Sequence, residues 1–371
     1  MDLGYLSPSS LWSTPDGLAM DARAWESVEE MARSHEGRFI VASPGFTRAP
    51  ATPVGCVALD IVSPAFDVVA VEPTAEGVDS LDLDAILALH SRSTAGLARA
   101  RTPVVLTSEV TYGIRLGIHR ASLSGLPLAR AAAGLLRQEA GLLRQVLWAA
   151  SLQANGPAAA RAYGRLTEDA LAFHDSRIRH AEVEAAATTP GWEGGPLRIG
   201  FSGRLDPIKG PGFAIALAKR AKEDGLPVEL HVFGAGPLEA ELRSSAGSNV
   251  VSRGFADFHE QWVPAVREEV DVMVLPHVQG DPSCTYFEAL GCGTPILAFA
   301  NQTSTYIAEE RGAGWVVPQR DVEAMLQVLR EILRDPRKLH DARAAGIALM
   351  RTHHFEATTR SRLRHLAQHA A

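Results

Sequence analysis

The 371-residue sequence contains few cysteines and no long apolar run. Cys56, Cys284 and Cys292 form neither a Cys-x-x-Cys pair nor an even set for disulfides, so we expect reduced thiols and a cytoplasmic chain. No window approaches the ~18 apolar residues that span a membrane, and the N-terminus lacks the basic start and apolar run of a secretory signal. Any membrane contact is therefore expected to be peripheral, at the inner face.

An excess of positive charge is also missing. The formal net charge is −7, which argues against a nucleic-acid-binding protein that works through one large basic face. Hydrophobic residues make up 46% and charged residues 21% of the chain, as in ordinary globular domains. Because this length exceeds the usual size of one domain, the sequence predicts two.

Short apolar runs alternate with helical patterns along the chain, which is typical of parallel sheets with crossover helices. In the first half, predicted strands lie at 38–43, 67–72, 85–90 and 103–108. A long helix is expected between Arg120 and Ala150. Six of its apolar residues repeat at helical spacing and are expected to face a core: Leu135, Leu136, Leu142, Leu143, Val146 and Leu147.

A second set of strands is predicted at 197–202, 228–233, 249–253, 271–276 and 295–300. The stretch at 181–196, rich in Gly, Pro, Thr and Ala, is interpreted as a linker. A final helix is expected from about Phe355 to His369. The predicted fold class is α/β, with two Rossmann-like domains at 1–178 and 179–354. Such sheets bind ligands beyond the carboxyl ends of their strands, so a cleft between the domains is the expected site.

The stretch FSGRLDPIKGPG at 201–212 places a glycine-rich loop between a strand and a helix. Its two cations, Arg204 and Lys209, stand beside the helix start, where backbone amides also favour anions. We therefore favour a diphosphate clamp over a solvated loop. GAGP at 234–237 follows another strand, but Glu239 stands where a dinucleotide fingerprint needs a third glycine, so binding and turn roles stay equally open.

The stretch GDPSCTYFEALGCGTP at 280–295 predicts a loop followed by a short helix closed by Gly291. The free amides of its first turn suit a phosphate. Glu288 lies one turn below Cys284, about 5.4 Å along the helix axis, where a carboxylate would meet ribose hydroxyls. A plain exposed helical glutamate is the alternative.

Four stretches in order, GRLDPIKG, VFGAGP, DPSCTYFEALGCGTPI and GAGWVVP, resemble the C-terminal domain of family 4 retaining glycosyltransferases of the GT-B fold. The resemblance covers about 197–320. In the first half, STPDGLAMDARAWESVEEMA is similar to the family's glycine loop and first helix, and ASLQANGPAAARAYGRL to the strand and loop that close its first domain. The GT-B fold implies that the last helix, within 355–371, returns to the first domain.

Carried over residue by residue, the resemblance implies diphosphate contacts for Arg204 and Lys209 and a ribose contact for Glu288. It places the amides of Ser283, Cys284 and Thr285 at the phosphates or donor sugar, with Gly203, Gly234 and Gly236 on the donor side. The implied reaction moves a sugar from a UDP- or GDP-linked donor to an acceptor with retention of configuration. No metal and no cofactor are implied, because cations and helix amides stabilise the leaving diphosphate.

The sequence departs from the family's Glu-x7-Glu pattern, because the first glutamate would fall at Gly280. Asp281, one place along, either replaces it at the donor sugar or, followed by Pro282, caps the helix. We keep both readings open and count Asp281 among the catalytic candidates. His277 is a further polar candidate, although a histidine after a strand is more often already hydrogen-bonded.

In the first domain, Glu109 is a catalytic candidate that would orient the acceptor or act as a weak base, and Arg115 is a candidate to face a phosphate. Further cleft candidates are Gly17, His90 and Asn155. The arginines at 130, 137 and 144 form a stripe that suits either an anionic membrane or a solvated helix face. We favour the solvated face, because Glu139 interrupts the stripe and no aromatic group flanks it.

The leading interpretation is a glycosyltransferase acting on a glycan, a lipid-linked saccharide or a small metabolite. The alternative is a non-catalytic GT-B protein that holds a nucleotide-sugar, which Gly280 favours and intact Arg204, Lys209 and Glu288 oppose. A sugar-nucleotide epimerase is a third, weaker interpretation. The base, sugar, acceptor and oligomeric state stay open.

Overall fold

The structure is a computed structural model that describes residues 1–14, 17–48, 58–61, 65–280 and 283–370. It divides into two compact units. Unit 1 comprises Met1–His119, Leu123–His174 and Glu356–Ala371, and unit 2 comprises Arg120–Ser122 and Asp175–Phe355.

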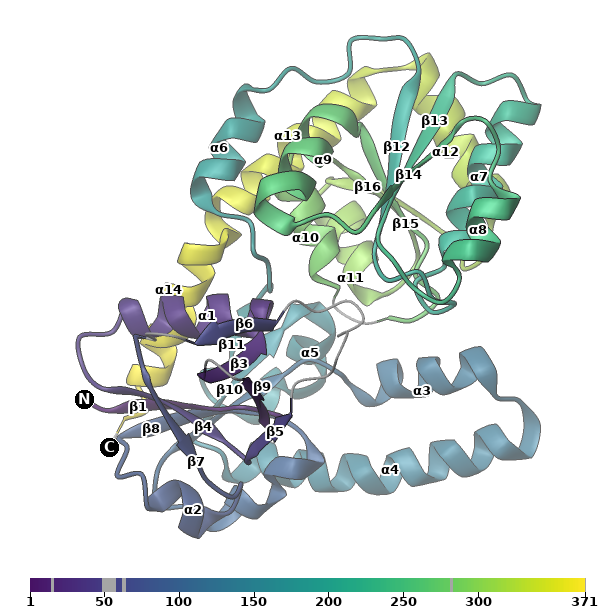
Figure 1. Cartoon of the computed structure of the whole chain (residues 1–371). Coiled ribbons are helices and arrows are strands. Elements are labelled where there is room, and N and C mark those ends of the chain that lie inside the picture. Colours follow the sequence, from purple (N-terminus) through teal and green to yellow (C-terminus); the bar gives the residue numbers. More distant parts are fainter. Residues whose placement is uncertain (15–16, 49–57, 62–64, 281–282, 371) are drawn as a thin grey trace. The chain divides into compact units, whose positions relative to one another are not determined.

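Unit 1 is built on a seven-stranded parallel sheet with the order β11-β10-β9-β8-β1-β4-β7 (Figure 1). Its strands are β1 Leu3–Leu6, β4 Phe39–Ser43, β7 Asp67–Ala70, β8 Ala85–Leu89, β9 Val104–Ser108, β10 Ser151–Asn155 and β11 Leu171–Phe173. Its helices are α1 Ala22–Arg33, α2 Ala75–Asp79, η1 Arg92–Arg99, α3 Tyr112–Ser122, α4 Gly125–Trp148, α5 Gly156–Tyr163, η2 Gly164–Leu166 and α14 Phe355–Ala367.

Strand β4 shows why both faces of this sheet are covered. Phe39 and Val41 join one core cluster, whereas Ile40 and Ala42 join the other. Successive residues of a strand point to opposite faces, so an uninterrupted apolar run needs helices on both sides.

Unit 1 also contains a small sheet that the sequence did not predict. Its order is β5-β2-β3-β6, from Phe46–Arg48, Leu11–Thr14, Gly17–Asp21 and Ala58–Ile61. The expected glycine loop is instead a β2–β3 hairpin, in which Thr14 pairs with Gly17 and Trp12 with Ala19. Strands of three to five residues carry too little alternation to be recognised.

Helix α14 packs within unit 1, as the GT-B expectation requires. Leu363 and Leu366 enter a core cluster with α1 and the sheet. Gln153 Nε2 donates to the Arg362 carbonyl at 2.8 Å, and Arg362 Nε donates to Gln153 Oε1 at 2.9 Å. These reciprocal hydrogen bonds tie the C-terminal helix to strand β10, the neighbour of edge strand β11.

Helix α4 corrects one expectation about the core. Leu135, Leu142 and Val146 are buried, but the paired residues Leu136, Leu143 and Leu147 are 57%, 37% and 68% exposed. Adjacent helical residues lie about 100° apart, so a helix that packs along one narrow stripe cannot bury both members of each pair. Among the described residues, no helix combines the length and apolarity needed to cross a membrane.

Unit 2 is built on a parallel sheet with the order β14-β13-β12-β15-β16-β17. Its strands are β12 Leu197–Ser202, β13 Val228–Phe233, β14 Val250–Gly254, β15 Val272–Leu275, β16 Ile296–Phe299 and β17 Gly314–Val317. Its helical elements are α6 His180–Thr188, α7 Pro211–Glu223, α8 Glu239–Ser245, η3 Phe258–Trp262, α9 Val263–Glu269, α10 Cys284–Gly291, α11 Gln302–Thr305, η4 Tyr306–Glu310, α12 Val322–Arg334 and α13 Arg337–His353.

The predicted linker at 181–196 is wrong in its first half, because α6 occupies it and belongs to unit 2. Val183 and Ala186 of α6 are buried. The alanine-rich segment has high helix propensity, and this outweighs the Thr, Gly and Pro that follow it.

Candidate functional site

The carboxyl ends of three neighbouring strands of unit 2 bring the candidate donor loops together. Strands β13, β12 and β15 are adjacent and parallel, so the loops that follow Phe233, Ser202 and Leu275 emerge from the same edge. This edge is where open parallel sheets bind their ligands. Three of the four motifs identified in the sequence for unit 2 lie at these loops or at α10, whereas GAGWVVP forms strand β17.

The loop after β12 is organised by Asp206, a residue that the sequence reasoning missed. Its Oδ1 accepts hydrogen bonds from the amides of Ile208 at 3.1 Å and Lys209 at 3.2 Å, and its Oδ2 accepts one from Arg204 Nε. Asp206 is 8% exposed, whereas the Arg204 side chain is 48% exposed. The signal was available, because Asp followed by Pro initiates turns.

Lys209 stands at the end of this loop, immediately before the N-cap of α7. The N-cap residue, Gly210, has φ 69°, and a Cβ there would lie 2.2 Å from the Pro276 carbonyl oxygen. The Val278 amide donates to the Ile208 carbonyl at 3.1 Å. The β12 and β15 loops are therefore fastened to each other, and Lys209 belongs to this joint structure.

The GAGP turn has a packing explanation. A Cβ on Gly234 would lie 2.0 Å from the Gly203 carbonyl oxygen, and one on Gly236 would lie 2.6 Å from the Leu205 carbonyl oxygen. The Leu205 amide donates to the Ala235 carbonyl at 3.0 Å. Close backbone approach thus requires both glycines, and the turn positions the β12 loop.

Helix α10 presents its first turn at the same edge. Its N-cap is Ser283, and the helix begins at Cys284, with Thr285 partly buried in the first turn. Asp281 and Pro282 lie outside the described residues, so both roles considered for Asp281 stay predictions. Cys284 Sγ donates to Asp175 Oδ2 at 3.7 Å, so this cysteine is held as a hydrogen-bonded thiol.

Glu288 is not the exposed helical glutamate that the sequence allowed as an alternative. It is 3% exposed in the second turn of α10, between the fully buried side chains of Phe287 and Ala289. A carboxylate withdrawn from water in this way needs polar partners to compensate for its desolvation.

His277 differs from the expectation that it would be already hydrogen-bonded. It is 1% exposed, and neither ring nitrogen has a hydrogen-bond partner among the described residues. Its ring centroid lies 5.3 Å from that of Tyr286 in α10. Burial, together with the charge of Lys209, holds its pKa well below the usual 6.5, so the imidazole is neutral. A buried polar group without a hydrogen-bond partner costs stability. His277 is therefore kept as a candidate functional residue.

In unit 1, the structure gives His90 a supporting role. Its Nε2 donates to the Leu142 carbonyl at 2.9 Å, so Nδ1 accepts from Ser108 Oγ at 3.0 Å. Its ring packs edge-on against Tyr163, with centroids 4.9 Å apart. Burial lowers its pKa. With both nitrogens bonded, the ring joins α4 to the sheet.

Arg115 is engaged inside unit 1 rather than facing a phosphate. It forms an ion pair with Glu139 of α4, and both side chains are 15% exposed. Glu139 also accepts from Tyr163 Oη at 2.8 Å, and burial together with this hydrogen bond raises the pKa of Tyr163 to about 12. Glu139 therefore points into the structure and does not interrupt the arginine stripe of α4.

Glu109 and Asn155 follow adjacent strands, β9 and β10, and the structure brings them together. Asn155 Nδ2 donates to Glu109 Oε1 at 3.4 Å. Glu109 is partly exposed, whereas Asn155 is buried as the N-cap of α5. Gly17 lies elsewhere, at the start of β3 with φ 144°, so its place in the hairpin explains the glycine.

Part of unit 2 is similar to a known family. Residues 196–335 match the family described as Glycosyl transferases group 1. The protein WcaL of Escherichia coli K12, assigned as a glycosyltransferase of colanic acid biosynthesis, is 30% identical over 195 residues, which cover 49% of this chain and 45% of WcaL. The 2-deoxystreptamine glucosyltransferase of Streptomyces kanamyceticus is 29% identical over 171 residues, covering 44% of this chain and 43% of that protein. The chain thus spans under half of these relatives.

Among solved structures, Anabaena Alr3699/HepE in complex with UDP is similar over 99% of this chain and 100% of that chain, with a TM-score of 0.67 and 15% identity. Sucrose-phosphate synthase from Thermosynechococcus elongatus covers 99% of this chain and 98% of its own, with a TM-score of 0.66 and 15% identity. These likenesses show the GT-B fold.

Proposed function

We propose that this chain, whose unit 2 belongs to the group 1 glycosyltransferases, transfers a sugar from a nucleoside diphosphate sugar to an acceptor. The observation that carries the proposal is the gathering of the β12 loop, the β15 loop and the start of α10 at one edge of the unit 2 sheet. The loops supply cations, the helix supplies free amides, and Glu288 supplies a buried carboxylate.

In the proposed reaction, the bond between the sugar and the diphosphate breaks, and negative charge develops on the leaving phosphate. Lys209, Arg204 and the first-turn amides of α10 stabilise that charge. Arg204 Nε donates a hydrogen bond to Asp206 Oδ2, which orients the guanidinium group. The Arg204 side chain is nevertheless about half exposed. Because these groups are fixed in advance, they need little reorganisation when the charge appears.

The donor is held, in this proposal, by Glu288 at the ribose hydroxyls. His277 makes the polar contact with the donor sugar that the family's first glutamate, replaced here by Gly280, would make. A neutral imidazole suits this task, because it can donate a hydrogen bond to a hydroxyl without adding a charge beside Lys209. Asp281 remains a second candidate for the same contact.

We propose uridine as the first base to test, because the solved relative Alr3699/HepE is in complex with UDP, and GDP as the comparison. Retention of the anomeric configuration is proposed from the family resemblance, and so is transfer chemistry that needs no metal. The acceptor is proposed to meet unit 1, where Glu109 follows β9.

Incubation of the purified chain with radiolabelled UDP- and GDP-sugars tests the activity. Transfer to added acceptor, or slow release of the free sugar, supports the proposal, and NMR of the product reports its anomeric configuration. Nucleotide-sugar binding without transfer or hydrolysis across the panel would favour the non-catalytic alternative. A second sugar-nucleotide formed without acceptor would instead indicate an epimerase.

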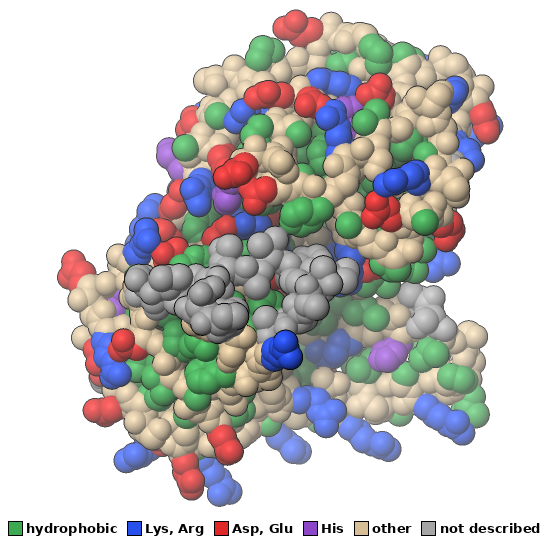
Figure 2. All heavy atoms as spheres, in the orientation of Figure 1, with side chains coloured by type: hydrophobic (Ala, Val, Ile, Leu, Met, Phe, Trp, Pro, Cys, Tyr) green, Lys and Arg blue, Asp and Glu red, His purple; other side chains and the backbone are tan. Residues whose placement is uncertain are grey.

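A peripheral membrane role for α4 is proposed on its exposed face. Leu136, Leu143 and Leu147 are exposed along it, and each of the first two directly precedes an exposed arginine, Arg137 or Arg144. Figure 2 shows basic side chains gathered along the edge of unit 1 where Figure 1 places α4. An apolar stripe beside a basic one suits an anionic lipid surface, which would bring a lipid-linked acceptor to the enzyme.

A further inference from the structure

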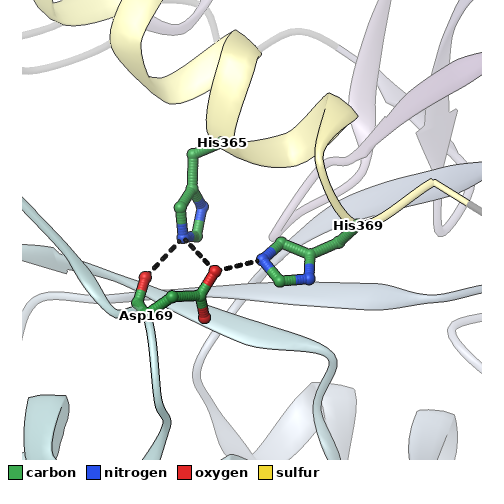
Figure 3. Close-up of side chains that lie close together, drawn as sticks. All are labelled: Asp169, His365 and His369. Carbon is green, nitrogen blue, oxygen red and sulfur yellow. Dashed lines mark hydrogen bonds and ion pairs between the residues drawn. The ribbon is translucent and has the colours of Figure 1, made fainter.

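A cluster of possible metal ligands lies within unit 1. Asp169 precedes β11, His365 lies on α14, and His369 lies in the turn that follows this helix (Figure 3). Each of the three side chains offers one ligand atom, and these atoms all lie within 4.8 Å of one another. Among the described residues, no other group of three or more His, Cys, Asp or Glu side chains has this geometry. Neither the family resemblance nor the proposed reaction uses these residues.

His365 and His369 are four residues apart, and the turn after α14 continues the winding of the helix, with the His369 amide donating to the Leu366 carbonyl at 3.1 Å. Residues four apart lie one turn apart on the same face, a spacing that suits two imidazole ligands of one ion. Figure 3 shows both rings directed toward Asp169. His369 Nε2 lies 2.7 Å from Asp169 Oδ2, and His365 Nε2 lies 3.8 Å from the same oxygen.

The surroundings of the cluster hold the ligands in place. Ser151 Oγ donates to Asp169 Oδ1 at 2.8 Å, which leaves Oδ2 directed to the histidines. Gln153 Nε2 lies 3.5 Å from His365 Nδ1. Side-chain exposure rises from 7% at His365 to 20% at His369 and 48% at Asp169, so an ion could enter from solvent. Supporting contacts of this kind orient first ligands in metal sites.

We propose that Asp169, His365 and His369 bind one divalent transition-metal ion, with zinc as its representative. Two imidazoles and one carboxylate are ligands that Zn²⁺ accepts, and water completes the tetrahedral set. On binding, each imidazole proton moves from Nε2 to Nδ1, so the Nε2 lone pairs face the ion. For His365 this gives up the hydrogen bond from Nε2 to the Asp169 carbonyl at 2.9 Å and requires Gln153 Nε2, 3.5 Å from Nδ1, to move away, and coordination of the ion compensates for both changes.

The ion would fasten the end of α14 to the segment before β11. Helix α14 is the last element of unit 1 and follows residues of unit 2 in the chain. Without metal, its last turn is held there by hydrogen bonds from His365 to the Asp169 carbonyl and from His369 to the carboxylate. A metal would replace these two contacts by coordination, so the site is structural and independent of the transfer reaction.

Isothermal titration of the full-length, tag-free chain with zinc, after removal of metal with a chelator, tests the proposal. A polyhistidine tag is avoided because it binds zinc itself. We expect one ion per chain, no heat with Mg²⁺, which prefers oxygen ligands, and a zinc-dependent rise in Tm. His369→Ala and Asp169→Asn should each weaken zinc binding at least about tenfold.

His340→Ala is the matched control, because His340 is an exposed histidine of α13 outside the cluster. It should leave zinc affinity unchanged. His369→Ala is preferred to a change of buried His365, and circular dichroism in the absence of metal checks that each variant is folded. Absence of stoichiometric zinc binding by the wild-type chain, or equal affinity in the wild type, His369→Ala and Asp169→Asn, would overturn the proposal.

Discussion

The backbone at Gly234 lies so close to Gly203 that a Cβ on Gly234 would stand 2.0 Å from the Gly203 carbonyl oxygen. Gly203 follows β12 and Gly234 follows β13, and the Gly203 amide donates to the Phe233 carbonyl at 3.2 Å. The contact sets the distance between two loops at the proposed donor edge. The close approach is possible because both residues are glycines and have no Cβ.

Gly234→Ala should therefore destabilise the chain by about 1–3 kcal/mol and weaken nucleotide binding, because the new methyl group meets backbone that cannot yield and φ is 129°. Urea unfolding and calorimetry with UDP measure the two effects. Gly212→Ala is the control, since nothing lies within 4 Å of its added Cβ in α7. Equal stability of both variants would contradict the packing argument.

Lys209→Ala should weaken binding of a nucleoside diphosphate by roughly 10- to 100-fold, because a hydrogen bond to a charged group contributes about 1.5–3 kcal/mol. Glu288→Gln should weaken binding of the nucleoside as well as the diphosphate, since the ribose is common to both. Calorimetry with UDP, GDP and uridine separates the two roles. Lys219→Ala, an exposed lysine of α7, is the control and should bind normally. Unchanged affinity in both test variants would sink the site assignment.

His277→Leu should keep or raise the free energy of unfolding at pH 7, by up to about 1–3 kcal/mol, because it removes two buried nitrogens that lack partners. The same change should lower transfer or donor hydrolysis while UDP still binds, since the proposed contact is to the sugar. Urea unfolding, calorimetry and the transfer assay measure these three properties. Lower stability together with normal turnover would show that His277 serves the fold alone.

The folded state should lose stability as the pH falls below 6.5, and His277 should contribute to that loss. Its pKa in the folded chain lies well below the usual 6.5, so between the two values only the unfolded chain binds the proton. Its stability contribution is present above pH 6.5 and declines below it, by at most about 1.4 kcal/mol per pH unit. Unfolding at pH 7.0 and 5.5 should show a shallower decline in His277→Leu than in the wild type.

Arg115→Met should destabilise unit 1 by about 1–3 kcal/mol, because it removes the positive charge that pairs with the largely buried Glu139 carboxylate and leaves the Tyr163 hydroxyl as its donor. Thermal unfolding measures the loss. Arg115→Met combined with Glu139→Gln should recover part of it, since the uncompensated charge is gone. If nucleotide affinity fell while stability did not, Arg115 would be a phosphate contact after all.

The pair Arg137→Glu and Arg144→Glu on α4 should reduce binding to vesicles that contain phosphatidylglycerol, on the order of 1 kcal/mol or more per arginine. Leu147→Ser should reduce it through lost apolar contact. Flotation with vesicles of phosphatidylcholine, with and without phosphatidylglycerol, measures both. Arg165→Glu, an exposed arginine outside α4, is the charge-matched control for one substitution. Failure of the wild type to float with anionic vesicles would remove the membrane role.

Removal of metal tests two proposals separately: the metal site at Asp169, and sugar transfer that needs no metal. Treatment with a chelator should lower Tm through the Asp169 cluster while leaving transfer intact at temperatures well below unfolding. Loss of activity in the cold without loss of structure would instead show that the transfer step needs a metal.

The sequence by itself determined the fold class, the strands of unit 2 that precede the donor loops, and the grouping of the motifs in those loops. These features follow from local patterns: apolar runs bounded by turns, glycines at strand ends, and the order of four motifs. The return of α14 to unit 1 was reached through the resemblance, and Gln153 and Arg362 show its physical basis.

Only the tertiary structure decided which polar groups are engaged and which are not. Asp206 orders the Arg204 loop, Glu139 points inward to Arg115, both nitrogens of His90 are bonded, and those of His277 are not. Asp169 meets two histidines that lie about 200 residues further along the chain. Burial and hydrogen bonding depend on neighbours that are distant in sequence, so a local pattern identifies a residue type without fixing its partner.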